Sequence, residues 1–300
     1  MLRHSATGCF PNSGFLIDAM TTNELTVDVN GLSLAVKTWG DPASKPLIAL
    51  HGWLDNAATF ERLAALLPDY YWVAPDLPGH GRSQHRGVGV ESSIWSYCVE
   101  VMALADALGL ENFFLLGHSM GGGIANLLAG IFPQRIQQLV LLDIMGVITT
   151  PAEQSLDTIR RGLDQRLGKP LRKAGLYSSL DDAITARARK GVSRQAAGLL
   201  GARGITQGDE GYYWSHDQRL TRKNLFTMSE EQLAPFLAAI TCPVMVITSA
   251  EAVVHEEALH RRAAMVSDIR IEHLPGGHHQ HLDGDVPAIA RLVGDFLAGK

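Results

Sequence analysis

Short apolar runs alternate with helical patterns along most of this 300-residue chain, and this alternation restricts the fold more than any other feature. The apolar runs have the length and composition of strands that are buried on both faces of a sheet. They cover residues 47–50, 71–74, 113–116, 139–142, 244–247 and 269–274. Helical periodicity covers residues 57–67, 94–108, 121–132, 256–266 and 286–297. These repeats predict an α/β fold, with a mostly parallel twisted sheet and helices on both faces.

The N-terminal part of the chain shows a different pattern. Residues 25–29 and 32–39 alternate apolar and polar side chains on either side of Asn30-Gly31. An Asn-Gly pair readily adopts the positive φ angles of a tight hairpin turn. We therefore expect an antiparallel hairpin ahead of the parallel strands. Residues 1–20 show no periodicity and are predicted to be a disordered extension.

The alternation is interrupted once, over residues 146–240. This stretch of about ninety residues contains only helix-like segments and is too long for a loop inside a compact domain. We predict a helical lid (cap) inserted after the sixth strand, so that residues 21–145 and 241–300 form one core. Residues 144–242 carry 14 basic and 10 acidic side chains, a net charge of +4, against −9 for the remainder. A basic lid would favour anionic substrates, although a solvated face better explains the cluster Arg187, Arg189, Lys190 and Arg194.

Composition excludes several classes of protein. The net charge of −5 and the pI of about 6.2 argue against nucleic-acid binding, which needs a basic surface. No segment approaches the ~18 consecutive apolar residues of a membrane helix. The three cysteines (Cys9, Cys98, Cys242) are odd in number and widely spaced, which fits a reducing compartment. We therefore expect a cytoplasmic protein without nucleic-acid or membrane partners, and a homodimer stays open.

One motif contains the strongest candidate for a catalytic residue. It follows the apolar run at 113–116, precedes the helical pattern at 121–132, and reads Gly117-His118-Ser119-Met120-Gly121. A strand that turns at once into a helix holds the serine in a strained conformation, and the glycines prevent collisions there. The serine hydroxyl then lies at a helix N-terminus, where developing negative charge is stabilised. This context predicts that Ser119 is a nucleophile.

From about residue 24 to 297 the chain resembles the α/β-hydrolase family. The resemblance rests on the motif at 117–121, which is called the nucleophile elbow, and on three further segments. These are Leu-His-Gly-Trp at 50–53, Asp-Leu-Pro-Gly-His-Gly-Arg-Ser at 76–83 and Pro-Gly-Gly-His at 275–278. The stretches at 51–56, 212–217 and 277–281 are most similar to its serine-hydrolase-like (kraken-type) branch. The resemblance implies an α/β-hydrolase fold and a site built from a serine, a histidine and an acid.

A serine hydroxyl is a weak nucleophile and needs a general base. Of the twelve histidines, the family's order of residues favours His278, which follows the last predicted strand and a Gly-Gly loop. A metal site that uses the neighbouring His279 and His281 is the alternative. No Cys or carboxylate stands nearby at a recognised ligand spacing, so we expect no metal.

Two carboxylates compete for the acid of the triad. Family members most often carry an Asp after the strand that follows the lid, but here the sequence reads Ser249-Ala-Glu-Ala252 and offers only Glu251. Other members use the end of the preceding strand, where this chain has Asp143. We favour Asp143 and keep Glu251 as the alternative, and a site without a functional acid also stays open. An acid is expected because it orients the imidazole and stabilises its charged form.

The resemblance also predicts the groups around the nucleophile. The backbone N–H groups of Met120 and Trp53 are expected to form the oxyanion hole. We assign the substrate pocket to His51, Asn56 and His118, with helix capping as the alternative role for Asn56. Together these residues predict a serine hydrolase that cleaves a small-molecule carboxylic ester through an acyl-enzyme, without a cofactor. Carbon–carbon, amide and thioester hydrolysis, or ligand binding without catalysis, remain alternatives.

Overall fold

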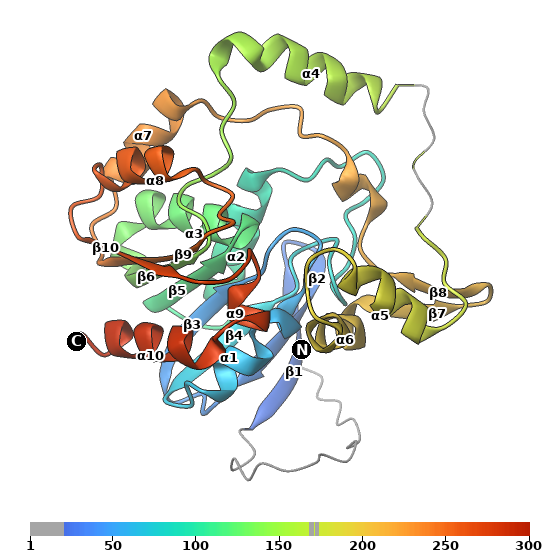
Figure 1. Cartoon of the computed structure of the whole chain (residues 1–300), viewed down its shortest axis with the longest axis horizontal. Coiled ribbons are helices and arrows are strands. Elements are labelled where there is room, and N and C mark those ends of the chain that lie inside the picture. The colour runs from blue at the N-terminus through green and yellow to red at the C-terminus, as the bar shows by residue number, and fades with distance from the viewer. Residues whose placement is uncertain (1–20, 168–170, 172–173) are drawn as a thin grey trace.

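An eight-stranded sheet forms the centre of the protein, in the order β1-β2-β4-β3-β5-β6-β9-β10 (Figure 1). The computed structural model describes residues 21–167, 171 and 174–300, so the extension predicted at residues 1–20 lies outside the described residues. The strands are β1 (Thr22–Val29), β2 (Leu32–Trp39), β3 (Lys45–Leu50), β4 (Tyr70–Pro75), β5 (Phe113–His118), β6 (Ile136–Leu142), β9 (Val244–Ser249) and β10 (Ile269–Leu274).

The direction of the strands confirms the predicted fold class. β1 and β2 form the antiparallel hairpin, with Val29 paired to Leu32 and with φ angles of 52° at Asn30 and 79° at Gly31. β2 is antiparallel to β4, and the pairs from β4 through β3, β5, β6 and β9 to β10 are all parallel. The sheet is therefore mostly parallel, with an antiparallel N-terminal edge.

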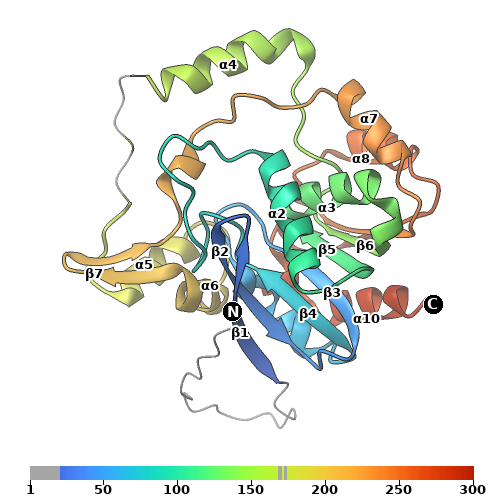
Figure 2. The same ribbon diagram turned by 180° about the vertical axis from the view of Figure 1, so that it is seen from behind.

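Helices cover both faces of this sheet (Figures 1 and 2). One apolar core lies between the sheet and four helices: α2 (Ile94–Ala107), α3 (Met120–Ile131), α7 (Glu230–Ala238) and α8 (Glu256–Ala263). A second core on the opposite face is formed with η1 (Ala57–Phe60), α1 (Glu61–Ala65) and α10 (Val286–Leu297). None of the described helices combines the length and the apolar character needed to cross a lipid bilayer.

Residues 146–240, called the insertion below, lie between β6 and β9 in the sequence. They contain η3 (Ala152–Gln154), α4 (Ser155–Asp164), α5 (Leu180–Ala188), α6 (Arg194–Gly204), β7 (Ile205–Gly208), β8 (Gly211–Trp214), η4 (Gln218–Thr221) and α7. The expectation of helices alone needs correction, because β7 and β8 form an antiparallel pair. These strands have only four residues each and are incompletely buried, so they lack the apolar run that marks the central strands.

Strand register brings three chain segments together at one edge of the sheet. His118, at the end of β5, pairs with Leu142 of β6, and Leu142 pairs with Ile247 of β9. The residues that follow therefore start from adjacent positions, as expected at the carboxyl ends of parallel strands. The backbone N–H of Ser119 donates to the carbonyl of Leu142 at 3.2 Å, and that of Asp143 donates to Ile247 at 2.8 Å.

Candidate active site

Ser119 lies at the junction of β5 and α3, in the backbone conformation predicted for a nucleophile elbow. Its φ angle is 50° and its ψ angle is −117°, a combination that L-residues rarely adopt. Close packing around the turn leaves no room for side chains beside it. A Cβ atom on Gly121 would lie 2.1 Å from the carbonyl oxygen of Leu50, and one on Gly117 would lie 2.5 Å from that of Gly121. The half-buried Ser119 side chain is thus presented at the N-terminus of α3.

The structure brings Ser119, His278 and Asp143 into one hydrogen-bonded chain. The Ser119 hydroxyl donates to Nε2 of His278 at 2.9 Å, and Nδ1–H of the same ring donates to Oδ2 of Asp143 at 2.5 Å. Asp143 is fully buried and follows β6, with a φ angle of 55°. The three groups therefore have the mutual geometry of a nucleophile, a base and the acid that orients the base.

Ser249, at the end of β9, holds the other oxygen of Asp143. Its backbone N–H and its hydroxyl both donate to Oδ1, each at 2.8 Å. Both carboxylate oxygens are thus in hydrogen bonds, which fixes the direction of the Oδ2 atom. Ser249 was not predicted as a site residue from the sequence. The available signal was its place at the carboxyl end of the strand adjacent to β6.

Glu251, the alternative acid, takes a different place. It is exposed in the turn after β9, and no hydrogen bond joins it to His278 among the described residues. Its Oε2 atom approaches the histidine loop at Gly277, where it would lie 3.1 Å from a Cβ atom. The carboxylate therefore reaches the backbone beside His278 without contacting the imidazole.

The two residues predicted to supply the oxyanion hole, Met120 and Trp53, lie close to the nucleophile in the chain or in space. Met120 opens α3, so its N–H is one of the donors that a helix N-terminus leaves free. Gly52, which precedes Trp53, packs so closely on the elbow that a Cβ atom there would lie 3.4 Å from Cβ of Ser119. Among the described residues, neither the Met120 nor the Trp53 amide donates to a protein acceptor. Both amides are thus available to a ligand oxygen.

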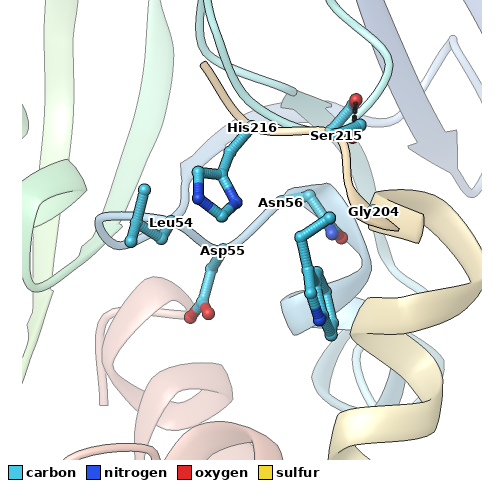
Figure 3. Close-up of a pocket in the computed structure, with 8 residues that line it drawn as sticks. Leu54, Asp55, Asn56, Gly204, Ser215 and His216 are labelled. Carbon is cyan, nitrogen blue, oxygen red and sulfur yellow. Dashed lines mark hydrogen bonds between the residues drawn. The ribbon is translucent and has the colours of Figure 1, made fainter. Parts of the chain in front are cut away.

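The three residues assigned to the substrate pocket have internal contacts instead. His51 is buried, donates from Nδ1 to the Gly52 carbonyl at 2.8 Å and accepts from the Leu77 amide at Nε2 at 2.9 Å. Asn56 caps η1, and its Nδ2 donates to the Leu200 carbonyl at 2.9 Å. Figure 3 shows Asn56 with Asp55 and His216 in a small pocket, and Ser119 is not among the residues that line this pocket.

His118 contacts the histidine loop. Its Nε2–H donates to the backbone carbonyl of His278 at 2.9 Å, and the two ring centroids are 4.7 Å apart. Burial lowers the pKa of His118 well below 6.5, and the neighbouring histidines lower it further. His118 is therefore neutral, and it holds the backbone of His278 in place.

His279 and His281, the candidates for a metal site, have protein partners. His279 Nε2 lies 3.3 Å from Oδ2 of buried Asp55, which also pairs with Arg187 at 3.1 Å. Burial opposes ionisation of Asp55, but His279 and Arg187 together lower its pKa. His281 shares a hydrogen bond with Thr59 at 2.8 Å. Among residues 21–167, 171 and 174–300, no group of three or more His, Cys, Asp or Glu side chains is arranged to hold a metal ion.

A cavity of about 630 Å³ adjoins the elbow. Ser119 and Met120 line it from the core, together with Trp53, whose indole N–H donates to the Leu220 carbonyl of the insertion at 3.0 Å. His51, Asn56 and His118 are not among its lining residues. Much of the wall is apolar, contributed by Ile94, Trp95, Val147, Leu225 and Phe226. The cavity can therefore hold an organic molecule of moderate size against the serine.

Comparison with known proteins agrees with the fold. The sequence profile of the family described as alpha/beta hydrolase fold matches residues 45–285. The serine hydrolase-like protein of Danio rerio is 28% identical over 92% of this chain and 88% of its own length. One from Dictyostelium discoideum is 30% identical over 89% of this chain and 79% of its own.

Among solved structures, a hypothetical protein of Pseudomonas aeruginosa PAO1 superposes with a TM-score of 0.87. It is 36% identical, and the match covers 92% of this chain and 99% of that one. The match of family profile, sequence and structure extends over the core and the insertion alike. The chain belongs to the α/β-hydrolase family, in its serine-hydrolase-like branch.

Proposed function

We propose that this protein hydrolyses carboxylic esters through an acyl-enzyme on Ser119. The observation that carries the proposal is the hydrogen-bonded chain Ser119–His278–Asp143, which ends at a cavity large enough for an organic ester. Each member has the partner that its role needs, and the fully buried Asp143 is oriented by Ser249. The names of the relatives, serine hydrolase-like proteins, agree with a serine nucleophile.

The chemistry follows from these contacts in two halves. Oγ of Ser119 forms a bond to the ester carbonyl carbon while Nε2 of His278 takes the hydroxyl proton. The tetrahedral intermediate collapses, the carbon–oxygen bond to the alcohol breaks, and His278 returns its proton to the leaving alkoxide. Water then attacks the acyl-enzyme with His278 again as base, which releases the acid and restores Ser119.

The remaining groups stabilise this pathway. The N–H groups of Met120 and Trp53 would bind the carbonyl oxygen as it becomes negative, aided by the N-terminus of α3. Asp143 accepts Nδ1–H of His278 and stabilises the imidazolium that forms at each proton transfer. We propose that the insertion acts as the lid of the site, since its residues 219–228 line the same cavity as Ser119.

A fluorophosphonate probe and p-nitrophenyl esters of increasing acyl length test the proposal. We expect labelling at Ser119 alone, and Ser119→Ala should lose labelling and retain less than about 1% of the turnover, as other triad removals do. Ser178→Ala, which alters an exposed serine of the insertion outside the cavity lining, should keep both. Labelling at another serine, or turnover by Ser119→Ala near the wild-type rate, would contradict the covalent mechanism.

A further inference from the structure

The cavity beside Ser119 is amphipathic, and its charged part is basic. Four cationic side chains line it, against the single carboxylate of Glu91. They are Arg166, Arg219, Arg222 and Lys223, all of which belong to the insertion. The apolar side chains described above line the same cavity. A ligand that fills this cavity therefore meets apolar side chains and an excess of positive charge.

Two of the four cations are neutralised within the protein. Arg166 donates from Nε and Nη2 to the two oxygens of Glu91, at 2.9 and 2.6 Å. This pair lowers the pKa of Glu91 and keeps it ionised. Arg219 donates from Nε and Nη2 to Asp217, at distances of 2.6 to 3.0 Å. Neither arginine needs a ligand to compensate its charge.

Arg222 differs from both. Its side chain is half-buried at the cavity, while Lys223 beside it is exposed. Within the described part of the chain, the Arg222 guanidinium makes no hydrogen bond or ion pair. Its charge acts on Glu91 through space, but Arg166 already bonds both oxygens of that carboxylate. The Arg222 backbone is held by its amide, which donates to the Arg219 carbonyl at 3.1 Å. A fork of five N–H donors on a half-buried side chain is thus available at the cavity.

We propose that Arg222 binds an anionic oxygen group, such as a carboxylate, at the far end of the ester substrate from the scissile bond. This inference rests on the proposed ester hydrolysis and names its substrate class: esters with an apolar body and an anionic terminus. A guanidinium matches a carboxylate with two parallel hydrogen bonds, and partial removal from water strengthens them. The reacting carbonyl would lie at Ser119 and Met120, which line the same cavity as Arg222 and the apolar side chains.

Two matched esters test this assignment: the mono-p-nitrophenyl ester of suberic acid and the same molecule with its free carboxylate methylated. For wild-type protein we expect a KM about tenfold lower for the carboxylate ester, the size of one charge-assisted contact. Arg222→Gln should raise that KM by about tenfold and leave the KM of the methylated ester unchanged. Arg189→Gln, which alters an exposed lid arginine outside the cavity lining, should change neither.

Binding provides a readout that does not depend on turnover. In the Ser119→Ala background, calorimetry should show about tenfold weaker binding of the carboxylate ester when Arg222→Gln is added. Equal affinity of the two esters, or an equal loss for both in Arg222→Gln, would overturn the role of Arg222. Selective binding without hydrolysis by the wild type would instead contradict the proposed function. Unchanged fluorophosphonate labelling of Arg222→Gln shows that the nucleophile region is intact.

Discussion

Asp143 uses its two carboxylate oxygens for different partners. Oδ1 accepts two hydrogen bonds from Ser249, and Oδ2 accepts the Nδ1–H of His278. Its φ angle of 55° lies in the left-handed region, where Asp and Asn are tolerated better than other side chains. An Asn at this position can therefore keep the backbone and the packing. Asp143→Asn therefore changes the charge and the hydrogen bond to His278 without changing the packing.

We predict that Asp143→Asn lowers kcat on p-nitrophenyl esters by roughly 10⁴-fold, with the fold retained. The amide oxygen would keep the bonds from Ser249, so the amide NH₂ would face Nδ1 of His278. The imidazole must then place its proton on Nε2, where it cannot accept the proton of Ser119. Circular dichroism checks the fold, and steady-state kinetics measure the loss.

Glu251→Gln is the matched control, because Glu251 is exposed and has no hydrogen bond to His278 within the described residues. We expect a change of less than about twofold, since an exposed charge acts weakly at a distance. A severe loss in Glu251→Gln with a mild one in Asp143→Asn would move the acid to the turn after β9. Equal, modest losses would mean that neither carboxylate orients the base.

Ser119 and His278 could be predicted from the sequence because each lies in a local motif. Such a motif can be identified without knowledge of the tertiary structure. The sequence favoured Asp143 but kept Glu251 as the alternative, since that choice depends on the register of β6 against β9. The same limit explains why the support from Ser249 was missed. Pairing Leu142 with Ile247 places Ser249 beside Asp143, and no local pattern encodes that pairing.

Among the elements, α6 anchors the insertion to the core through one buried arginine. Arg203 donates from Nε to both oxygens of fully buried Asp76, at 2.9 and 2.8 Å. Its Nη1 donates to Glu24 of β1 at 2.5 and 2.7 Å. Asp76 also accepts the amide of Ala57, which opens η1. One side chain of the insertion thus connects a strand and a helix of the core.

We predict that Arg203→Met lowers the free energy of unfolding by about 3–5 kcal/mol, because it leaves the Asp76 carboxylate buried without its cation. Arg194→Met is the control on the same helix. Arg194 pairs with Asp181 at the surface, so its loss should cost less than about 1 kcal/mol. Urea unfolding of both variants measures the difference. Equal costs would show that α6 gains no special stability from Asp76.

The strands of the insertion show where apolar periodicity no longer predicts secondary structure. The central strands β5, β6 and β9 were predictable because each contains a run of four apolar residues that is fully buried. The pair β7–β8 was not, because its side chains are half-buried or exposed. Its antiparallel register joins Thr206 to Tyr213 and Gln207 to Tyr212, mixtures that predict no strand by themselves. Tertiary contacts, not sequence pattern, define that hairpin.

At the scale of the whole molecule, the buried histidines link stability to pH. His80, His118 and His281 are fully enclosed, and burial holds the pKa of each well below 6.5. Other histidines near His118 and His281 lower those two pKa values further. All three are therefore neutral in the folded protein at pH values where the unfolded chain already binds protons.

Stability must fall as pH drops below 6.5, since there the unfolded state binds more protons than the folded state. The carboxylates in ion pairs affect the pH dependence of stability only at lower pH. Glu230, for example, has a pKa lowered to about 2 chiefly by its bond to Arg262, so its contribution is lost only below the unfolded value of 4.5. Between pH 7.5 and 5.5 the histidines should dominate the change.

We predict that the free energy of unfolding is lower at pH 5.5 than at pH 7.5, by up to about 1.4 kcal/mol for each buried histidine that stays neutral in the folded protein. Urea unfolding at both pH values measures the difference. His281→Gln, whose amide can replace the bond to Thr59, should reduce this difference by about 1.4 kcal/mol. His273→Gln, which alters an exposed histidine of β10, should leave it unchanged. A difference that His281→Gln and His273→Gln alter equally would show that burial of neutral imidazole does not govern acid stability, and the pH dependence would then arise from the carboxylates.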